Sequence, residues 1–176
     1  MWGVMPQLFG QKLRHLRHNQ NLTQIELAKQ LALSSYTHIT KLEADQRTPS
    51  LDLVIRLATA LDESVDYFLR DTLPVEASAK FELHLPPNNQ PIPQLFGPKL
   101  RALRLQSGWG QTEMARRLGL ARRGYISNLE GGRKMPSLDL VVVIADLFEV
   151  TTDYLLRDAI PAQSYSSTIA NIPPDE

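Results

Sequence analysis

The 176-residue sequence contains no cysteine, which excludes disulfide bonds and thiolate metal sites and favours a reducing compartment. It also contains no apolar run near the roughly 18 residues that a membrane-spanning helix needs. Residues 1–5 are too short and uncharged a stretch for a signal peptide. The sequence therefore predicts a soluble cytoplasmic protein that does not enter a membrane.

An excess of charge of either sign is missing as well, because 19 Lys and Arg balance 19 Asp and Glu. A neutral chain lacks the overall positive charge that marks many nucleic-acid-binding proteins, so any such role must depend on where the charges lie. Nucleophile elbows, phosphate-binding glycine loops and HExxH motifs are also missing. We therefore expect neither enzymatic activity nor a cofactor. His15 and His18 lack a third metal ligand, so a solvated helix face explains them better than a metal site.

What the sequence does contain is an internal repeat. Residues 6–14 (PQLFGQKLR) return as residues 93–101 (PQLFGPKLR), at an offset of 87. At this offset, and without a gap, about 30 of roughly 66 paired positions are identical. The chain is therefore predicted to contain two related heads, over residues 6–71 and 93–158.

A proline-bounded extension follows each head, over residues 72–92 and 159–176. In the first extension, residues 79–85 end in an alternation of apolar and polar side chains that is typical of a half-buried strand. Residues 166–172 of the second extension alternate only weakly. Because a lone strand is not stable, we expect these segments to pair in a small β-ribbon, either with each other or with those of a second chain in a homodimer.

Each head is predicted to fold into five short helices, so the fold class is all-α. Phe9, Leu13 and Leu16 recur at helical spacing and predict a helix over residues 7–19 with one buried face. Side chains that can accept hydrogen bonds stand where the later helices should begin. In the first head these are Thr23 with Glu26 as a capping box, Ser34 and Ser35 before a helix that continues to about Ala44, then Ser50, and Ser64. In the second head Gly110 replaces Thr23, and Trp109 is expected to pack against the core.

Four short motifs occur in the same order in both heads. In the first head they are Gln24-x-Glu26-Leu27-Ala28, Ile39-Thr40-x-Leu42-Glu43, Pro49-Ser50-Leu51 and Asp66-Tyr67-Phe68-Leu69. This ordered set resembles the Cro/lambda-repressor-like (xenobiotic-response-element) helix-turn-helix family, over roughly three quarters of the chain. The resemblance implies that the third helix of each head lies in the major groove of DNA and that the second helix crosses the backbone. The stretch between these helices is one residue longer than in the phage repressors, so the resemblance does not fix which residue faces which base.

The resemblance places the DNA contacts on the second and third helices and on the turn that follows them. Gln24 and Gln111 begin the second helix of each head, where they can donate to phosphate. Arg can bind guanine and Asn can bind adenine through two hydrogen bonds, each worth ~1–3 kcal/mol of discrimination. Arg47, Arg133 and Lys134 follow the third helices and suit phosphate better. The predicted DNA-binding residues are Gln24, Ser35, Tyr36, Thr37, His38, Thr40, Lys41 and Arg47 in the first head, and Gln111, Arg116, Arg122, Arg123, Gly124, Tyr125, Ser127, Asn128, Arg133 and Lys134 in the second.

Several of these residues have a second interpretation. Tyr36 and Tyr125 can be surface aromatics packed on a neighbouring helix, and Arg122 with Arg123 can be a solvated pair of charges. Glu43 and Glu130 would repel phosphate, so we expect them to be structural.

The two heads differ in charge. Residues 6–71 carry 8 Lys and Arg against 8 Asp and Glu, whereas residues 93–158 carry 10 against 7. We therefore expect the second head to bind DNA more tightly, and the two heads to prefer different half-sites that form an imperfect inverted repeat.

These observations favour a sequence-specific DNA-binding transcriptional regulator, either a repressor or an autoregulator, whose partner is double-stranded DNA. The alternative is a protein-interaction or antitoxin-like module in which one or both heads no longer bind DNA. A homodimer through the extensions and a self-contained pseudo-dimer both fit the sequence, and nothing in it indicates a small-molecule effector.

Overall fold

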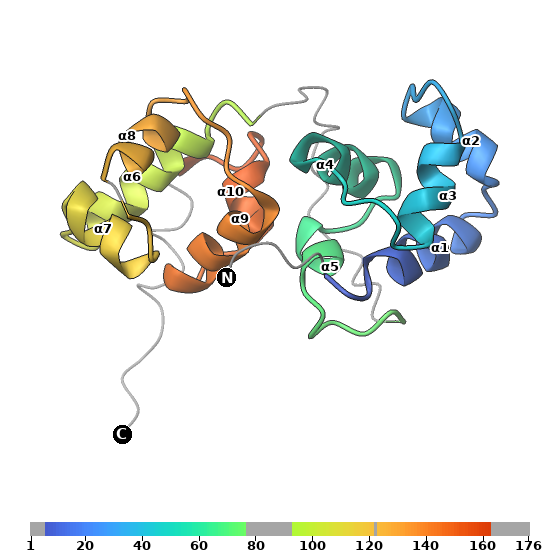
Figure 1. Ribbon diagram of the computed structural model, residues 1–176, viewed down its shortest axis with the longest axis horizontal. Helices are drawn as coiled ribbons and strands as arrows, with labels where there is room; N and C mark the ends of the chain where they lie inside the picture. The colour runs from blue at the N-terminus through green and yellow to red at the C-terminus, as the bar shows by residue number, and fades with distance from the viewer. Residues whose placement is uncertain (1–5, 77–92, 122, 163–176) are drawn as a thin grey trace.

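The computed structural model describes residues 6–76, 93–121 and 123–162, and these ranges hold ten helices and no strand (Figure 1). The segments with predicted strands, 79–85 and 166–172, lie outside the described residues. No helix in the described ranges combines the length and apolar character needed to cross a bilayer. The prediction of an all-α protein with five helices in each head is confirmed. The helices of the first head are α1 (Phe9–Asn19), α2 (Gln24–Gln30), α3 (Thr37–Glu43), α4 (Leu51–Ala60) and α5 (Val65–Leu69); those of the second are α6 (Phe96–Gln106), α7 (Gln111–Arg117), α8 (Arg123–Glu130), α9 (Leu138–Leu147) and α10 (Thr152–Leu156).

Most of the expected helix caps are present. Thr23 and Glu26 form the capping box, with the Glu26 N–H donating to Thr23 Oγ1 at 3.2 Å and the Thr23 N–H donating to Glu26 Oε2 at 2.7 Å. Ser50 and Ser64 accept from the N–H groups three residues on. Gly110 begins α7 in an extended conformation without a side-chain acceptor.

Two helices begin later than the sequence predicts. The helix expected from residue 7 begins at Phe9, because the N–H groups of Gln7 and Leu8 donate to the Asp71 carboxylate and so lie outside the helix. The third helix begins at Thr37, whose N–H donates to Ser35 Oγ at 3.2 Å, so Ser35 acts as an acceptor one residue before the helix.

The ends of α1 and α5 complete each other. Asp71 caps the start of α1, while the buried Lys12 of α1 donates through Nζ to the carbonyl oxygens of Tyr67 at 2.7 Å and Arg70 at 2.6 Å, at the end of α5. The second head repeats this arrangement with Asp158 and Lys99. Burial lowers the pKa of Lys99 to about 8, and the charge of Asp158 opposes that shift. The C-terminal end of each five-residue helix is thereby fixed to α1 or its equivalent α6.

The first helix of each head also passes very close to the third. A Cβ atom on Gly97 would lie 2.5 Å from the carbonyl oxygen of Glu130 and 2.8 Å from that of Leu129, and Gly10 is similarly confined. Only glycine therefore permits this approach of α6 to α8 and of α1 to α3.

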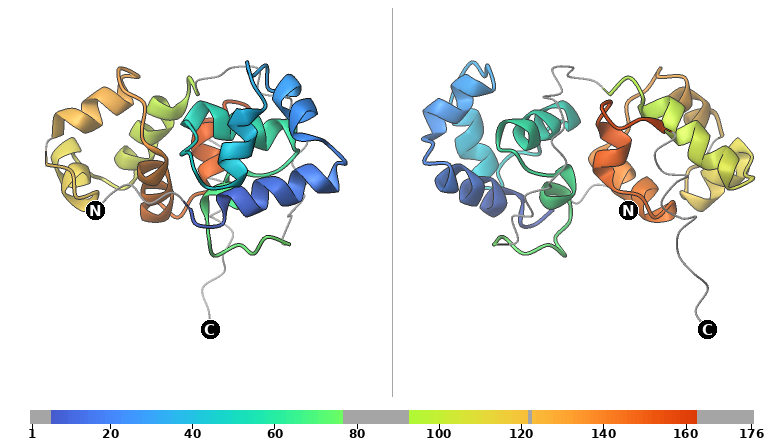
Figure 2. Two further views of the ribbon diagram at one scale, coloured as in Figure 1. Left: turned by 45° about the vertical axis from the view of Figure 1, so that its right-hand side comes forward. Right: turned by 180° about the vertical axis from the view of Figure 1, so that it is seen from behind.

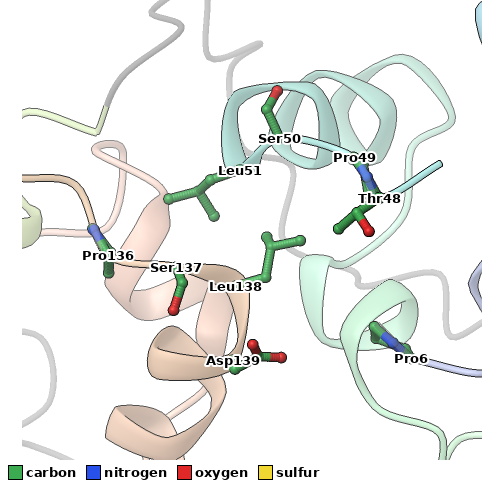
Figure 3. Close-up of a pocket in the computed structure, with 9 residues that line it drawn as sticks. All are labelled: Pro6, Thr48, Pro49, Ser50, Leu51, Pro136, Ser137, Leu138 and Asp139. Carbon is green, nitrogen blue, oxygen red and sulfur yellow. The ribbon is translucent and has the colours of Figure 1, made fainter. Parts of the chain in front are cut away.

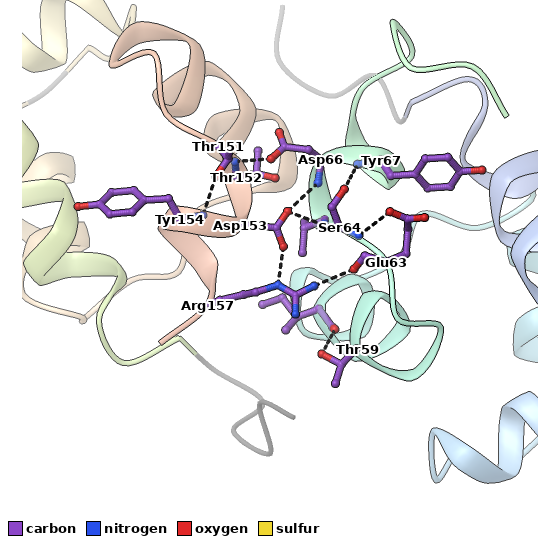
Figure 4. Close-up of polar contacts among 12 residues, drawn as sticks. Thr59, Glu63, Ser64, Asp66, Tyr67, Thr151, Thr152, Asp153, Tyr154 and Arg157 are labelled. Carbon is purple, nitrogen blue, oxygen red and sulfur yellow. Dashed lines mark hydrogen bonds and ion pairs between the residues drawn. The ribbon is translucent and has the colours of Figure 1, made fainter. Parts of the chain in front are cut away.

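The two heads meet through α5 and α10, which lie at the centre of the molecule with α2 and α7 at its opposite ends (Figures 1 and 2). Asp153 of α10 accepts hydrogen bonds from the backbone N–H groups of Val65 at 2.8 Å and Asp66 at 3.3 Å, at the start of α5. Asp66 in turn accepts from the backbone N–H of Thr152 at 2.8 Å, at the start of α10 (Figure 4). Each of these helices therefore begins on an acceptor that the other head supplies.

Residues within each head complete these helix starts. Ser64 Oγ accepts from the N–H of Tyr67 at 2.9 Å, and Thr151 Oγ1 accepts from the N–H of Tyr154 at 3.0 Å. The first N–H groups of a helix have no partner inside it, so they need acceptors from elsewhere. The local caps and the carboxylates from the opposite head together supply them.

An arginine from each head strengthens the contact. Arg157, which also pairs with Asp153 on its own helix, donates to the carbonyl oxygen of Glu63 at 2.7 Å. Arg70, which pairs with an aspartate of α5, reaches Asp146 of the second head at 2.6 Å. Arg70 and Arg157 are equivalent in the repeat but have different partners across the boundary, so the two-fold arrangement is approximate.

Equivalent elements of the repeat therefore pack on each other, as in the interface of a symmetric dimer. A cavity of about 270 Å³ lies at the same boundary, lined by Pro6, residues 48–51 and residues 136–139 (Figure 3). Residues 49–51 and 136–138 within these segments are equivalent in the repeat and lead into α4 and α9. The single chain thus has the architecture of a pseudo-dimer.

Gly97→Ala should lower the free energy of unfolding by about 1–3 kcal/mol, because backbone atoms of α8 have to move away from the new methyl group. Gly124→Ala is the matched control, since beyond its chain neighbours and the nearby backbone of its own helix no described atom lies within 4 Å of its Cβ position, and alanine favours a helix by up to ~1 kcal/mol. Urea denaturation followed by circular dichroism measures both. Equal effects of the two substitutions would contradict the close approach.

Asp153→Asn should lower the free energy of unfolding by about 3 kcal/mol, because an amide cannot accept from α5 and from Arg157 with both of its terminal atoms. Asp146→Asn removes another carboxylate from the same boundary, but Asp146 is 55% exposed, so we expect a loss of less than ~1 kcal/mol. Urea denaturation of both variants provides the test. A loss from Asp153→Asn no larger than that from Asp146→Asn would refute the role of the capping carboxylate.

Candidate nucleic-acid interface

In each head, the second and third helices form a helix-turn-helix unit that packs on the first. Ile39 and Leu42 of α3 are buried, and Ile126 and Leu129 of α8 occupy the same places in the second head. The opposite side of each third helix is left to solvent. This is the side that the sequence assigns to DNA.

A polar network fixes α1, α2 and α3 to one another. Glu43 at the end of α3 pairs with Arg17 of α1, with Nε to Oε1 at 2.6 Å, and both side chains are less than one tenth exposed. Gln24 Nε2 donates to the same carboxylate at 2.9 Å, and Thr40 Oγ1 donates to Gln24 Oε1 at 2.7 Å. These interactions, in the C-terminal half of α3, fix the orientation of that helix relative to α1 and α2.

The second head repeats most of this network. Arg104 pairs with Glu130 at 2.6 Å, and Gln111 Nε2 donates to Glu130 at 2.9 Å. Burial acts to raise the pKa of Glu130, but hydrogen bonds from Arg104 and Gln111 outweigh burial, so the pKa lies below its ordinary value. The same causes lower the pKa of Glu43. These contacts confirm the prediction that Glu43 and Glu130 are structural.

The predicted DNA-binding residues fall into three groups by exposure. Gln24, His38, Gln111, Tyr125 and Ser127 are half-buried. Arg122 and the side chain of Arg123 lie outside the described part of the structure. The exposed residues are Ser35, Tyr36, Thr37, Thr40, Lys41, Arg47, Arg116, Gly124, Asn128, Arg133 and Lys134.

Positive charge gathers around His38 in the first head. Burial, followed by the charges of Arg47, Arg56 and Lys41, lowers the pKa of His38. The imidazole is therefore neutral at pH 7, in a region where cations from three parts of the head come together. Such a region suits a phosphate group.

In the second head, an aromatic ring positions a cation beside the third helix. Lys134 Nζ lies 4.2 Å from the centre of the Tyr125 ring, which is a cation–π contact. The partner of Tyr125 in this contact belongs to the turn after α8 and not to a neighbouring helix, so the contact of Tyr125 with DNA stays a prediction. Lys134 itself is exposed and is held at the end of α8.

The arginines of α7 are less available than the sequence suggests. Arg116 and Arg117 both pair with Glu113 at 2.8 Å, and Arg117 also stacks on Trp109 at 4.2 Å. Trp109 in turn contacts Phe148, with ring centres 5.3 Å apart, as its expected packing requires. Much of the charge of Arg116 is therefore balanced within its own helix.

Sequence reasoning missed the residues that join the heads and the buried lysines. Nothing in the sequence indicated what Asp66, Asp153, Lys12 and Lys99 contact, although Asp66 and Lys12 are identical to Asp153 and Lys99 at the equivalent positions of the repeat. The sequence did contain a signal for them, because polar residues outside the predicted DNA-binding helices are identical in the two heads. Surface positions without a structural role have no reason to stay identical after a duplication.

Known families match both heads. A family model described as "Helix-turn-helix" matches residues 13–68, and another described as "Helix-turn-helix domain" matches residues 95–158. The two matches together cover more than half of the chain.

Individual regulators are similar to part of the chain. The HTH-type transcriptional regulator PrpR of Mycobacterium tuberculosis is 40% identical over 63 residues, or 36% of this chain and 13% of that protein. The prophage-derived, uncharacterized regulator YonR of Bacillus subtilis is 35% identical over 63 residues, or 36% of this chain and 57% of that protein. The regulator AnsR of Bacillus subtilis is 38% identical over 58 residues, or 33% of this chain and 49% of that protein. The matches thus span 13% to 57% of the relatives' lengths. No solved structure matches the chain.

Glu130→Gln should lower the free energy of unfolding at pH 7 by about 3 kcal/mol, because it leaves the buried Arg104 without its carboxylate. The folded pKa of Glu130 lies below the ordinary 4.5, so its ionisation stabilises the fold above pH 4.5, and this contribution is lost as the pH falls through the folded value. Stability of the variant should therefore fall less steeply below pH 4.5 than that of the unmodified protein.

The control is Asp52→Asn, which removes a partly exposed pair with Arg56 and should cost ~0.5 kcal/mol or less. Urea denaturation between pH 3 and 7 measures all three proteins. Parallel pH profiles for Glu130→Gln and the unmodified protein would refute the assigned role.

Proposed function

The chain belongs to the Cro/lambda-repressor-like helix-turn-helix family, in two tandem copies, and on that premise we propose that it is a sequence-specific DNA-binding transcriptional regulator. The observation that carries the proposal is the doubled helix-turn-helix unit joined through equivalent elements. The same function is supported by three relatives that are named HTH-type transcriptional regulators.

In this proposal one chain does the work of a dimer. Helix-turn-helix dimers place two recognition helices in successive major grooves, about one helical turn of DNA apart, by a two-fold axis between the subunits. Here the contact between α5 and α10 supplies an approximate two-fold axis within one polypeptide. We propose that α3 and α8 enter successive major grooves of one bipartite site.

We favour this self-contained pseudo-dimer over a homodimer through the extensions. The start of α5 is completed by Asp153 and the start of α10 by Asp66, so the two heads already form a two-fold pair within one chain and need no second chain to do so. We propose the boundaries 6–71 and 93–158 for the two DNA-binding units.

The predicted DNA-binding residues divide into those that contact phosphate and those that contact bases. Arg47, Arg133 and Lys134 suit phosphate contacts at the ends of the third helices. Arg122, Arg123 and Asn128 suit the edges of guanine and adenine. Because Arg116 is paired with Glu113, we assign the stronger binding of the second head mainly to Arg122, Arg123, Arg133 and Lys134.

A repressor or an autoregulator is the simplest role for such a protein. A protein that covers two successive major grooves blocks access to a promoter by occupancy alone. The proposal requires neither a cofactor nor an effector.

Selection from a random pool of DNA duplexes should enrich a site with two half-sites about 10 base pairs apart, or a multiple of that distance. One chain should occupy the site in a stoichiometric titration, and affinity should fall steeply with salt because bound phosphates release counterions. Fluorescence anisotropy on the selected duplex measures both the stoichiometry and the salt dependence.

The double variant Arg122→Ala with Arg123→Ala should weaken binding by about tenfold or more and relax the sequence preference of one half-site. Arg116→Ala is the control, because the Arg116 charge is paired with Glu113, and its affinity should change by less than about threefold. If no site is enriched and binding does not depend on salt, the proposed function as a DNA-binding regulator is refuted, and a protein-interaction module becomes the better hypothesis.

A further inference from the structure

The start of α3 exposes one large aromatic side chain among polar groups that are already engaged. Tyr36 is 49% exposed, directly before α3. The hydroxyl groups of its neighbours Ser35 and Thr37 share a hydrogen bond of 2.8 Å, and Ser35 Oγ also accepts from the Thr37 N–H. Part of the hydrogen-bonding capacity of Ser35 and Thr37 is therefore used within the chain, and the apolar groups that these residues offer to a base are the Tyr36 ring and the Thr37 methyl group.

One turn further along α3, the polar groups are engaged as well. Thr40 Oγ1 donates to Gln24 Oε1, and Gln24 donates to Glu43. The exposed Lys41 adds a positively charged donor, whose hydrogen bonds phosphate oxygens or guanine O6 and N7 can accept. Between residues 35 and 41, the groups that this head can turn to a base are thus mainly the Tyr36 ring, the Thr37 methyl group and Lys41, whereas the cations around His38 suit phosphate.

The second head differs at each of these places. Positions 36 and 37 correspond to Arg123 and Gly124, and the Cβ position of Gly124 has no atom within 4 Å. Position 41 corresponds to Asn128, which is exposed and whose side chain makes no hydrogen bond to another residue in the described ranges. This head offers charged and amide donors where the first offers an aromatic ring and a methyl group.

The base that presents an apolar group in the major groove is thymine, through its 5-methyl group. We infer that the first head recognises its half-site by packing thymine methyl groups against the Tyr36 ring and the Thr37 methyl group, whereas the second head reads purine edges. This inference rests on the proposed function. It assigns Tyr36 as a specificity-determining residue of the first head.

The test replaces thymine by deoxyuridine, which removes the methyl group and leaves base pairing unchanged. On the selected site, each such replacement in the half-site of the first head should weaken binding by about fourfold per contacted methyl group. Replacements in the other half-site should change affinity by less than about twofold. Selection with Arg123→Ala, which should lose the preference of the second head, identifies which half-site belongs to which head.

Three variants test Tyr36 itself. Tyr36→Ser should lower the sensitivity of the first half-site to deoxyuridine to the part that the Thr37 methyl group contributes, and Tyr36→Phe should keep it in full, because the ring is what Tyr36 packs on a methyl group. Ile25→Thr is the matched control, since Ile25 is 51% exposed but lies on α2, and threonine stands at the equivalent position 112. It should leave the sensitivity to deoxyuridine unchanged.

Three results would overturn the inference and leave the proposed function standing: an enriched site whose first half contains no thymine, equal or absent effects of deoxyuridine in the two halves, or an effect of undiminished size in Tyr36→Ser. If no site is enriched at all, the proposed function and this inference both fail.

Discussion

Asp66 and Asp153 occupy the point on which the arrangement of the two heads depends. The helices α5 and α10 have five residues each, too few to be stable alone, and their first N–H groups need acceptors from elsewhere. Each carboxylate supplies those acceptors to the helix of the other head. Hydrogen bonds to backbone N–H groups are directional, so this contact fixes an angle as well as a distance. The relative placement of α3 and α8 therefore follows from how α5 and α10 begin.

The same principle operates inside each head. Asp71 completes the start of α1 and Lys12 the end of α5, while Glu43 joins the third helix to Arg17 and Gln24. Short helices leave a large share of their backbone groups unpaired, and a small core cannot compensate for many of them. Charged side chains from other helices satisfy these groups, and the carboxylates at the boundary extend this pattern from one head to the next.

Local chemistry made much of this predictable. Thr23, Ser50 and Ser64 stand at helix starts because their oxygens accept from the third N–H, and a sequence contains that information directly. The structural role of Glu43 followed from its charge, which would repel phosphate. Asp66 and Arg70, by contrast, are four residues apart, at the start of α5 and just after its end, which in a sequence indicates an ordinary solvated ion pair. Their reach across the boundary depends on how two distant surfaces meet, and no local pattern encodes that.

Duplication within one chain removes a constraint that a homodimer cannot escape. In a symmetric homodimer both subunits present the same DNA-binding surface, so the DNA site that the dimer prefers is also symmetric. In this chain the polar anchors and the residues 49–54 are identical in both heads, whereas residues 34–38 differ at every position from residues 121–125. The parts that hold each head and join it to its neighbour have stayed alike, and the parts that face outward at the third helix have diverged. A covalent pseudo-dimer can therefore keep the geometry of a two-fold regulator while each head binds a chemically different half-site.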